Sequence, residues 1–243
     1  WFASLIESVS LLVISLPIAF IAPLFLLFIY RFNPILEPHK KEDNRVSRFE
    51  YLALGKPFII IQIAVFVLIT LNDALIARFA EGDLRDYQVL YRYFSIMSIM
   101  SSIISMVIWS NVGRKALEFD VKFRINSILM SALGLSLCWL VMLFLTDRVV
   151  FIWLGDSVEV EGALRVSLFC LAQSMLFIVA GFLNAQGRIG SQARWLGAIA
   201  IIKVFLVVVS LSTTLFDASF VISVSAVLLS IATLRLSILY IFE

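Results

Sequence analysis

Ionisable and metal-binding side chains are scarce in this sequence. Only 15% of its 243 residues are charged, and it holds one histidine and two cysteines. The lone His39 has no second histidine with which to form a metal or catalytic pair, and Cys138 and Cys170 lie in apolar runs, where they fit as small buried side chains. Glycine-rich phosphate loops are also absent. We therefore expect no enzyme, no catalytic residues, no cofactor, no metal site and no nucleic-acid partner.

Apolar residues, by contrast, make up 62% of the chain, and the mean hydropathy is +1.04. A soluble domain of this length could not bury so much apolar surface in one core. A membrane span needs roughly 20 mostly apolar residues. Runs of this kind predict an all-α, polytopic transmembrane helix bundle with about seven spans, near 9–30, 52–78, 88–110, 124–146, 163–184, 195–212 and 219–241.

The segments between the predicted spans alternate in charge. Lysine and arginine outnumber acidic residues in 31–50, by five to four, and in 111–124 and 185–195, whereas acidic residues outnumber them in 79–87 and 147–162. Basic loops are retained on the cytoplasmic side of a membrane. We therefore expect the three basic segments to be cytoplasmic loops of a multi-pass membrane protein.

The first of these loops, 31–50, is the longest polar connection in the chain. It contains Pro34 and Pro38 and is typical of a solvated linker between two helix bundles. We place an internal boundary there, so that six helices from Tyr51 onward form one unit. The chain begins without methionine and ends at an apolar run, which leads us to expect a fragment of a longer protein.

Lys203 is the deepest ionisable residue of the predicted spans. It lies about eight residues into the 195–212 helix, or ~12 Å at ~1.5 Å per residue. Ionisable groups at such depth usually face a bundle interior or a water-filled cavity. Two interpretations stay open: Lys203 is a functional cation facing a cavity, or it pairs with a neighbouring carbonyl group or with Gln173.

Asp73 is the only acidic residue clearly within a predicted span, and Arg92 lies at similar depth at the start of the next helix. We expect these two side chains to form a salt bridge, either at the outer mouth of a cavity or as a static pair. Gln62 precedes Asp73 by eleven residues, almost three helical turns. Gln62 and Asp73 are therefore expected on one face of their helix, as a polar stripe.

Two further residues near the span ends have more than one interpretation. Arg235 either extends to the membrane interface or faces the cavity, and Tyr91 either joins an aromatic belt or contacts a sugar. The deep cations Lys203, Arg92 and Arg235 outnumber the one deep acid. Because an unbalanced positive cavity is costly unless an anion enters it, we expect a cargo that carries a phosphate or carboxylate group.

Five short motifs follow one another along the chain: NDALIAR at 72–78, YQVLYR at 87–92, KALEFD at 115–120, WLG at 153–155 and NAQG at 184–187. Their order, together with the span lengths, resembles the carboxy-terminal half of polysaccharide transporters of the MOP superfamily. These are the Wzx-like flippases for O-antigen and lipopolysaccharide repeat units. The resemblance covers most of the chain, from about Tyr51 to Ile241.

The resemblance implies two six-helix lobes around a central cationic cavity. Residues 1–31 would hold the last helix of a truncated amino-terminal lobe, 32–50 a basic cytoplasmic linker and 51–243 the carboxy-terminal lobe. Such transporters flip undecaprenyl-pyrophosphate-linked oligosaccharides across the bacterial inner membrane by alternating access. The polar residues singled out above would then bind substrate or line the cavity: Lys203, Arg92, Asp73, Gln62, Arg235, Gln173 and Tyr91.

The same resemblance implies the partners. The lipid-linked oligosaccharide is the expected substrate, in a setting of membrane lipids, with H+ or Na+ as a possible coupling ion and glycan polymerase machinery as a possible neighbour. Cavity residues of the first lobe are missing from this chain, so only half of such a site is assigned.

Two other functions stay open. A cation-coupled multidrug-type exporter of the same superfamily would favour acidic cavity residues, of which Asp73 is the one example. A membrane-embedded glycan polymerase or transferase would need a general base or metal-binding acids near the interface, often on a large outer loop. The outer loops expected in this chain are short and lack histidine. A scaffold role would leave Lys203 and Asp73 unexplained.

Overall fold

A computed structural model describes residues 48–112, 121–155, 160–213 and 216–242 of the chain. Within these ranges the helices are joined by short turns, and no strand is present. Six helical segments are long and apolar enough to cross a membrane, which confirms the all-α, multi-pass class. The expected first span, 9–30, and the linker as far as residue 47 lie outside the described residues.

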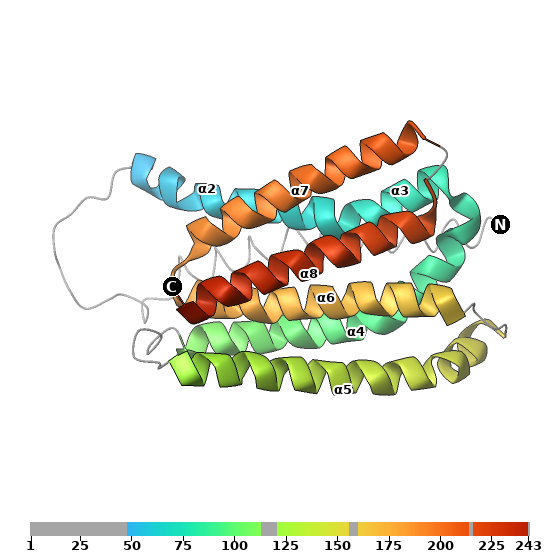
Figure 1. The fold of residues 1–243 in the computed structure, drawn as a ribbon, viewed down its shortest axis with the longest axis horizontal. Coiled ribbons are helices and arrows are strands. Elements are labelled where there is room, and N and C mark those ends of the chain that lie inside the picture. Colours follow the sequence, from blue (N-terminus) through green and yellow to red (C-terminus); the bar gives the residue numbers. More distant parts are fainter. Residues whose placement is uncertain (1–47, 113–120, 156–159, 214–215, 243) are drawn as a thin grey trace. The chain divides into compact units, whose positions relative to one another are not determined.

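The first described span consists of three consecutive helical pieces, and the other five are single helices (Figure 1). The first span changes from α-helix to a short π-helix, η2, and back. The pieces are α2 (Arg48–Val65), η2 (Phe66–Thr70) and α3 (Leu71–Phe79), followed by α4 (Glu81–Val112), α5 (Val121–Leu154), α6 (Val160–Ala185), α7 (Ile189–Leu211) and α8 (Ala218–Phe242).

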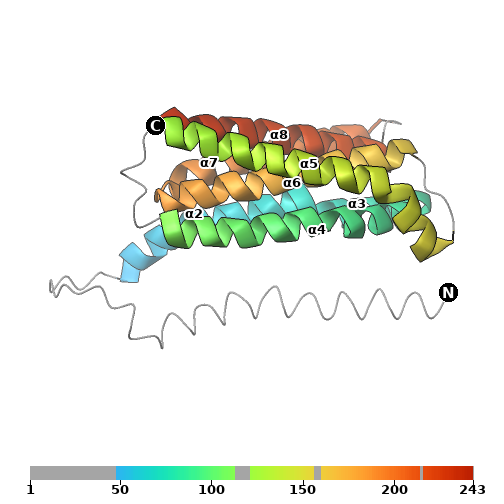
Figure 2. The ribbon, with the colours of Figure 1, turned by 90° about the horizontal axis from the view of Figure 1, so that it is seen from below.

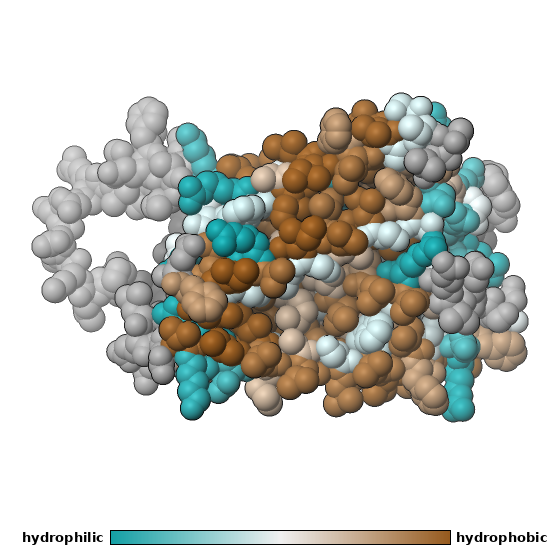
Figure 3. All heavy atoms as spheres, in the orientation of Figure 1, coloured by the Kyte–Doolittle hydropathy of each residue, from teal (hydrophilic) through white to brown (hydrophobic). Residues whose placement is uncertain are grey.

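Successive spans run in opposite directions, so the helix ends gather at two ends of the bundle (Figures 1 and 2). We call the end where α2, α5 and α7 begin the basic end, and the opposite end, where α4, α6 and α8 begin, the acidic end. Figure 3 shows apolar side chains over the middle of the visible face and polar ones gathered toward both ends. This distribution is that of a membrane-spanning bundle.

Two segments expected as loops are largely helical. The acidic segment 79–87 forms the end of α3 and the first turns of α4, separated by Ala80 alone. Carboxylates in the first turn of a helix are favourable because the helix dipole is positive there, and Glu81 and Asp83 occupy that turn of α4. Because the polar residues favour a loop, the predicted start of this span, residue 88, lies after the observed start of α4 at Glu81. The basic segment 185–195 likewise includes the start of α7.

The core of the described bundle is centred on α6. In its membrane span 72% of the residues are buried, against 6% in the span of α5. Helices α4 and α8 run in the same direction as α6 and pack against it on two sides (Figures 1 and 2). The large apolar side chains of α5 instead face outward, as on a helix whose surface contacts lipid.

Small residues allow α4 and α6 to approach closely. The hydroxyl groups of Ser98 and Ser174 lie 3.1 Å apart across the interface. Seven residues further along each helix, Gly181 faces Ser105 so closely that a Cβ atom at Gly181 would collide with the serine hydroxyl. Close backbone contact through small residues is the usual way in which helices associate within lipid.

Arginine side chains hold the carboxyl end of α8 at the basic end. Arg124 Nη1 donates to the Tyr240 carbonyl at 3.2 Å, and Arg188 Nη1 donates to the Leu239 carbonyl at 3.0 Å. The last carbonyl groups of a helix lack partners within the helix, and cations stabilise them. Two of the residues expected to mark the cytoplasmic side thus also tie α8 to the start of α5 and to the α6–α7 turn.

The Gly181–Ser105 contact makes a testable prediction. The variant Gly181→Val is expected to lower the free energy of unfolding by about 1 to 3 kcal/mol, because the added methyl groups overpack the α4–α6 interface. The matched control is Gly134→Val on α5, where a Cβ atom meets no neighbour within 4 Å. Thermal unfolding in detergent compares the two, and equal melting temperatures would contradict the tight contact.

Candidate functional site

Lys203 is fully buried and contacts η2 and α3 rather than an open cavity. Its ammonium group Nζ donates to the Val67 carbonyl at 2.8 Å, the Leu68 carbonyl at 3.0 Å and Asn72 Oδ1 at 2.5 Å. A lysine ammonium group has three protons to donate and no acceptor, so these three oxygens satisfy it. Of the two interpretations of Lys203, the structure shows the pairing with carbonyl groups; Gln173 is not among its partners.

The two carbonyl groups belong to the π-helical turn η2. There the Leu71 amide donates to the Phe66 carbonyl, five residues earlier, instead of four. A π turn interrupts the regular ladder of α-helical hydrogen bonds, which leaves carbonyl groups able to accept from elsewhere. The turn contains neither glycine nor proline, so the contact from α7 is the visible physical reason for its position.

Ser225 on α8 completes this cluster. Its hydroxyl lies 3.1 Å from Asn72 Oδ1 and 2.7 Å from the Val221 carbonyl, and both Asn72 and Ser225 are fully buried. Asn72, Lys203 and Ser225 each lie seven or eight residues from the acidic end of their helices. Three spans therefore contribute one polar residue each at about the same depth. We call Val67, Leu68, Asn72, Lys203 and Ser225 the Lys203 cluster.

A second polar group lies around Asp73. The Asp73 carboxylate is half-buried and lies near the Tyr87 hydroxyl, which is buried and has no hydrogen-bond partner. It also experiences the charge of Arg92. The structure shows no direct ion pair between Asp73 and Arg92, which corrects the expected salt bridge. Tyr87 and Arg92 are five residues apart, or about 140° around α4 at about 100° per residue. The helix thus presents Tyr87 to Asp73 and leaves Arg92 exposed.

Aromatic rings connect this group to α6. Tyr91 stacks on Tyr87 with ring centroids 5.7 Å apart and lies 6.0 Å from Phe169 on α6. The Tyr91 hydroxyl interacts with Gln173, which is buried and whose side-chain oxygen accepts no hydrogen bond. Tyr91 therefore packs between α4 and α6 within the bundle, and its place in an aromatic belt or against a sugar stays a prediction.

Arg235 and Gln62 belong neither to the Lys203 cluster nor to the group around Asp73. The Arg235 guanidinium lies over the Trp195 ring, 4.9 Å from its centroid, which is the geometry of a cation–π contact between α8 and α7. Gln62 is exposed on α2. The expected stripe from Gln62 to Asp73 is interrupted because η2 lies between them and changes the helical rotation.

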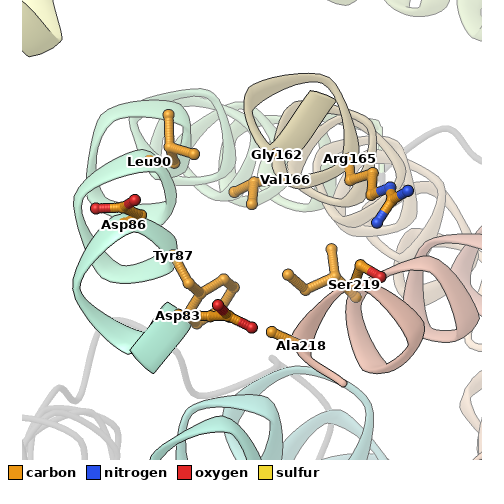
Figure 4. Close-up of a pocket in the computed structure, with 10 residues that line it drawn as sticks. Asp83, Asp86, Tyr87, Leu90, Gly162, Arg165, Val166, Ala218 and Ser219 are labelled. Atoms are coloured by element: carbon orange, nitrogen blue, oxygen red, sulfur yellow. The ribbon is translucent and has the colours of Figure 1, made fainter. Parts of the chain in front are cut away.

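A pocket of about 290 Å³ opens at the acidic end between the first turns of α4, α6 and α8 (Figure 4). No three histidine, cysteine, aspartate or glutamate side chains gather there, or elsewhere in the part of the chain that the structure describes, to hold a metal ion. The pocket is lined by Asp83, Asp86, Tyr87, Leu90, Gly162, Arg165, Val166, Ala218, Ser219 and Ile222.

Comparison with known proteins adds no relative. The chain matches no protein-family model, no curated protein and no solved structure. Function is therefore inferred from the residues and geometry described above.

The sequence had indicated several members of these groups but not all of them. Asn72, Ser225, Tyr87 and Trp195 are the residues that sequence reasoning missed. For Asn72 and Ser225 a weak signal existed, because each lies six residues from the acidic end of its predicted span, whereas Lys203 lies nine residues from that end. For Tyr87 and Trp195 the sequence contains no comparable signal, since an aromatic residue near a span end most often belongs to the membrane interface.

The Lys203 cluster makes a second testable prediction. Replacing Asn72 by leucine removes one acceptor from a buried ammonium group, and the variant is expected to lose at least about 1 to 3 kcal/mol of stability. The matched control is Asn126→Leu, at an exposed position of α5. Chemical denaturation in detergent measures both. A loss no greater in Asn72→Leu than in the control would mean that the Asn72 contact contributes little.

Proposed function

We propose that this chain is the carboxy-terminal lobe of a membrane transporter that flips undecaprenyl-pyrophosphate-linked oligosaccharide repeat units across the bacterial inner membrane. It would work by alternating access and serve polysaccharide or O-antigen biosynthesis. One observation carries the proposal: cations within the described spans outnumber the single deep acid, and two of them, Arg92 and Arg235, remain accessible at the bundle surface.

An exposed charge in a membrane span needs a polar environment. Transfer of an arginine to the middle of a span costs roughly 2.5 to 3.5 kcal/mol on insertion scales. Arg92 is exposed on α4, and Asp73 is too distant to pair with it directly. A second lobe, water or an anionic cargo facing α4 would remove this cost. A pyrophosphate group provides strong acceptors for the planar guanidinium group.

Arg235 supports the same proposal from the other half of the bundle. It is half-buried near the basic end, and the Trp195 ring supports its guanidinium group without neutralising its charge. A cation–π contact fixes the position of a cation and leaves its N–H groups able to bind an anion. Arg92 and Arg235 therefore lie toward opposite ends of the lobe, as two separate positions where a lipid-linked anion would be bound during transfer.

Lys203 has a different part in this proposal. Its three protons are already donated within the protein, so in this conformation it supports the bundle instead of binding cargo. The basic end would face the cytoplasm, with 31–50, 111–124 and 185–195 on that side. H+ or Na+ would drive the cycle.

A cation-coupled exporter of drug-like molecules is the second candidate, and Asp73 is the observation in its favour. Its half-buried carboxylate faces Tyr87, within a span. A carboxylate in that position is suited to binding a proton or an organic cation. The two candidates differ in the residue on which transport depends: the arginines in a flippase, and Asp73 in a cation-coupled exporter of drugs.

The experiment is genetic. Deleting the gene from its native host is expected to stop surface polysaccharide and to accumulate the lipid-linked repeat unit, and the full-length protein is expected to restore both. The variants Arg92→Ala and Arg235→Ala should each restore less than a tenth of the polymer, because the anion loses a cationic partner worth about 1.5 to 3 kcal/mol. Gel analysis of extracted polysaccharide measures the effect.

Arg148→Ala, at an exposed arginine near the acidic end of α5, is the matched control and should restore full polymer. Wild-type polymer levels in both test variants at equal membrane abundance would refute the flippase proposal. A deletion strain with normal polysaccharide but raised drug sensitivity, rescued by wild type and not by Asp73→Asn, would establish the exporter instead.

A further inference from the structure

The Lys203 ammonium group is surrounded by oxygens that carry no formal charge. Two are backbone carbonyl oxygens of η2, and the third is the amide oxygen of Asn72, which the Ser225 hydroxyl also contacts. Buried charges in proteins are usually paired with an opposite charge. The nearest acid along the chain, Asp73, directs its carboxylate toward Tyr87 instead.

This set of oxygens has the chemistry of an ion site rather than of a salt bridge. Carbonyl oxygens from an irregular helical turn, together with amide and hydroxyl oxygens, replace the hydration shell of a monovalent cation in membrane proteins. Divalent cations bind sites that include carboxylates, and the Lys203 cluster has none. All three oxygens come from the first described span. Lys203 of α7 and Ser225 of α8 approach them at about the same depth, so three helices enclose the site.

We propose that the Lys203 cluster is a monovalent-cation site that the chain fills with its own ammonium group. Lys203 takes the place of a bound alkali ion and supplies the charge from a side chain anchored on α7. The wild-type protein then needs no free cation at this position. Removing the lysine side chain exposes a latent site for Na+, K+ or NH4+, bound by the carbonyl groups of Val67 and Leu68 and by Asn72. The inference is independent of the proposed cargo.

The test compares thermal unfolding of the full chain in detergent in four chloride salts of equal ionic strength. The cations are Na+, K+, NH4+ and the bulky N-methyl-D-glucamine, which cannot enter the site. The wild type should melt at one temperature in all four. Lys203→Ala should melt lowest in N-methyl-D-glucamine and gain about 2 to 4 °C, saturably, with at least one of the small cations.

Lys203→Met is the matched control, because its uncharged side chain fills the space that the ion would take. It should melt equally in all four salts. The proposal fails if Lys203→Ala is insensitive to the cation, if the wild type responds as strongly, or if Lys203→Met responds like Lys203→Ala.

A double variant, Lys203→Ala with Asn72→Asp, covers the case in which Lys203→Ala does not fold. The added carboxylate strengthens cation binding at the same position, so this variant should be folded in the small-cation salts and less stable in N-methyl-D-glucamine. If neither variant folds in any salt, a free ion cannot replace the ammonium group and the proposal is overturned. Because polysaccharide export is not measured, this outcome is distinguishable from failure of the flippase proposal.

Discussion

The contact between Lys203 and the carbonyl groups of η2 is the interaction on which the arrangement of the first, fifth and sixth described spans depends. In lipid a backbone carbonyl without a partner and a cation without a partner are both costly. Here the carbonyl groups of the π turn accept hydrogen bonds from the buried ammonium group, so the carbonyl groups and the cation both have partners. Asn72 and Ser225 extend the contact to a third helix. The rest of the bundle packs as membrane helices usually do. Serine and glycine bring α4 and α6 together, and α6 is the centre of the core.

The membrane class follows from the sequence because it depends only on length and apolarity, and six spans in the structure agree with the predicted ones. Span ends were less predictable. Glu81 and Asp83 are polar and lie in a segment expected to be a loop, yet they occupy the first turn of α4, where the helix dipole favours acidic side chains. Hydropathy locates the part of a helix that lipid covers, whereas the helix itself continues into the polar region.

The sequence predicted how deep the site residues lie in their spans, but not which way their side chains point. Asp73 and Arg92 do lie near the same end of neighbouring spans, but rotation about α4 turns Arg92 away. The depth of Lys203 was equally clear, while its acceptors were not, because two of them are backbone atoms and η2 has no glycine or proline to reveal it. The interruption between Gln62 and Asp73 has the same origin. Residue spacing predicts a shared helix face only when the helix is regular, and the π turn η2 lies between Gln62 and Asp73.

The two arginine contacts at the basic end have a mechanical consequence. Arg124 and Arg188 attach the last turn of α8 to α5 and to the α6–α7 turn, so those segments resist separation at that end. At the other end, the starts of α4, α6 and α8 surround a hollow. A small angular displacement of α8 about the arginine contacts would be magnified along its length. The arginine contacts at the basic end would therefore act as the pivot of such a displacement, and the pocket at the acidic end gives the start of α8 room to move.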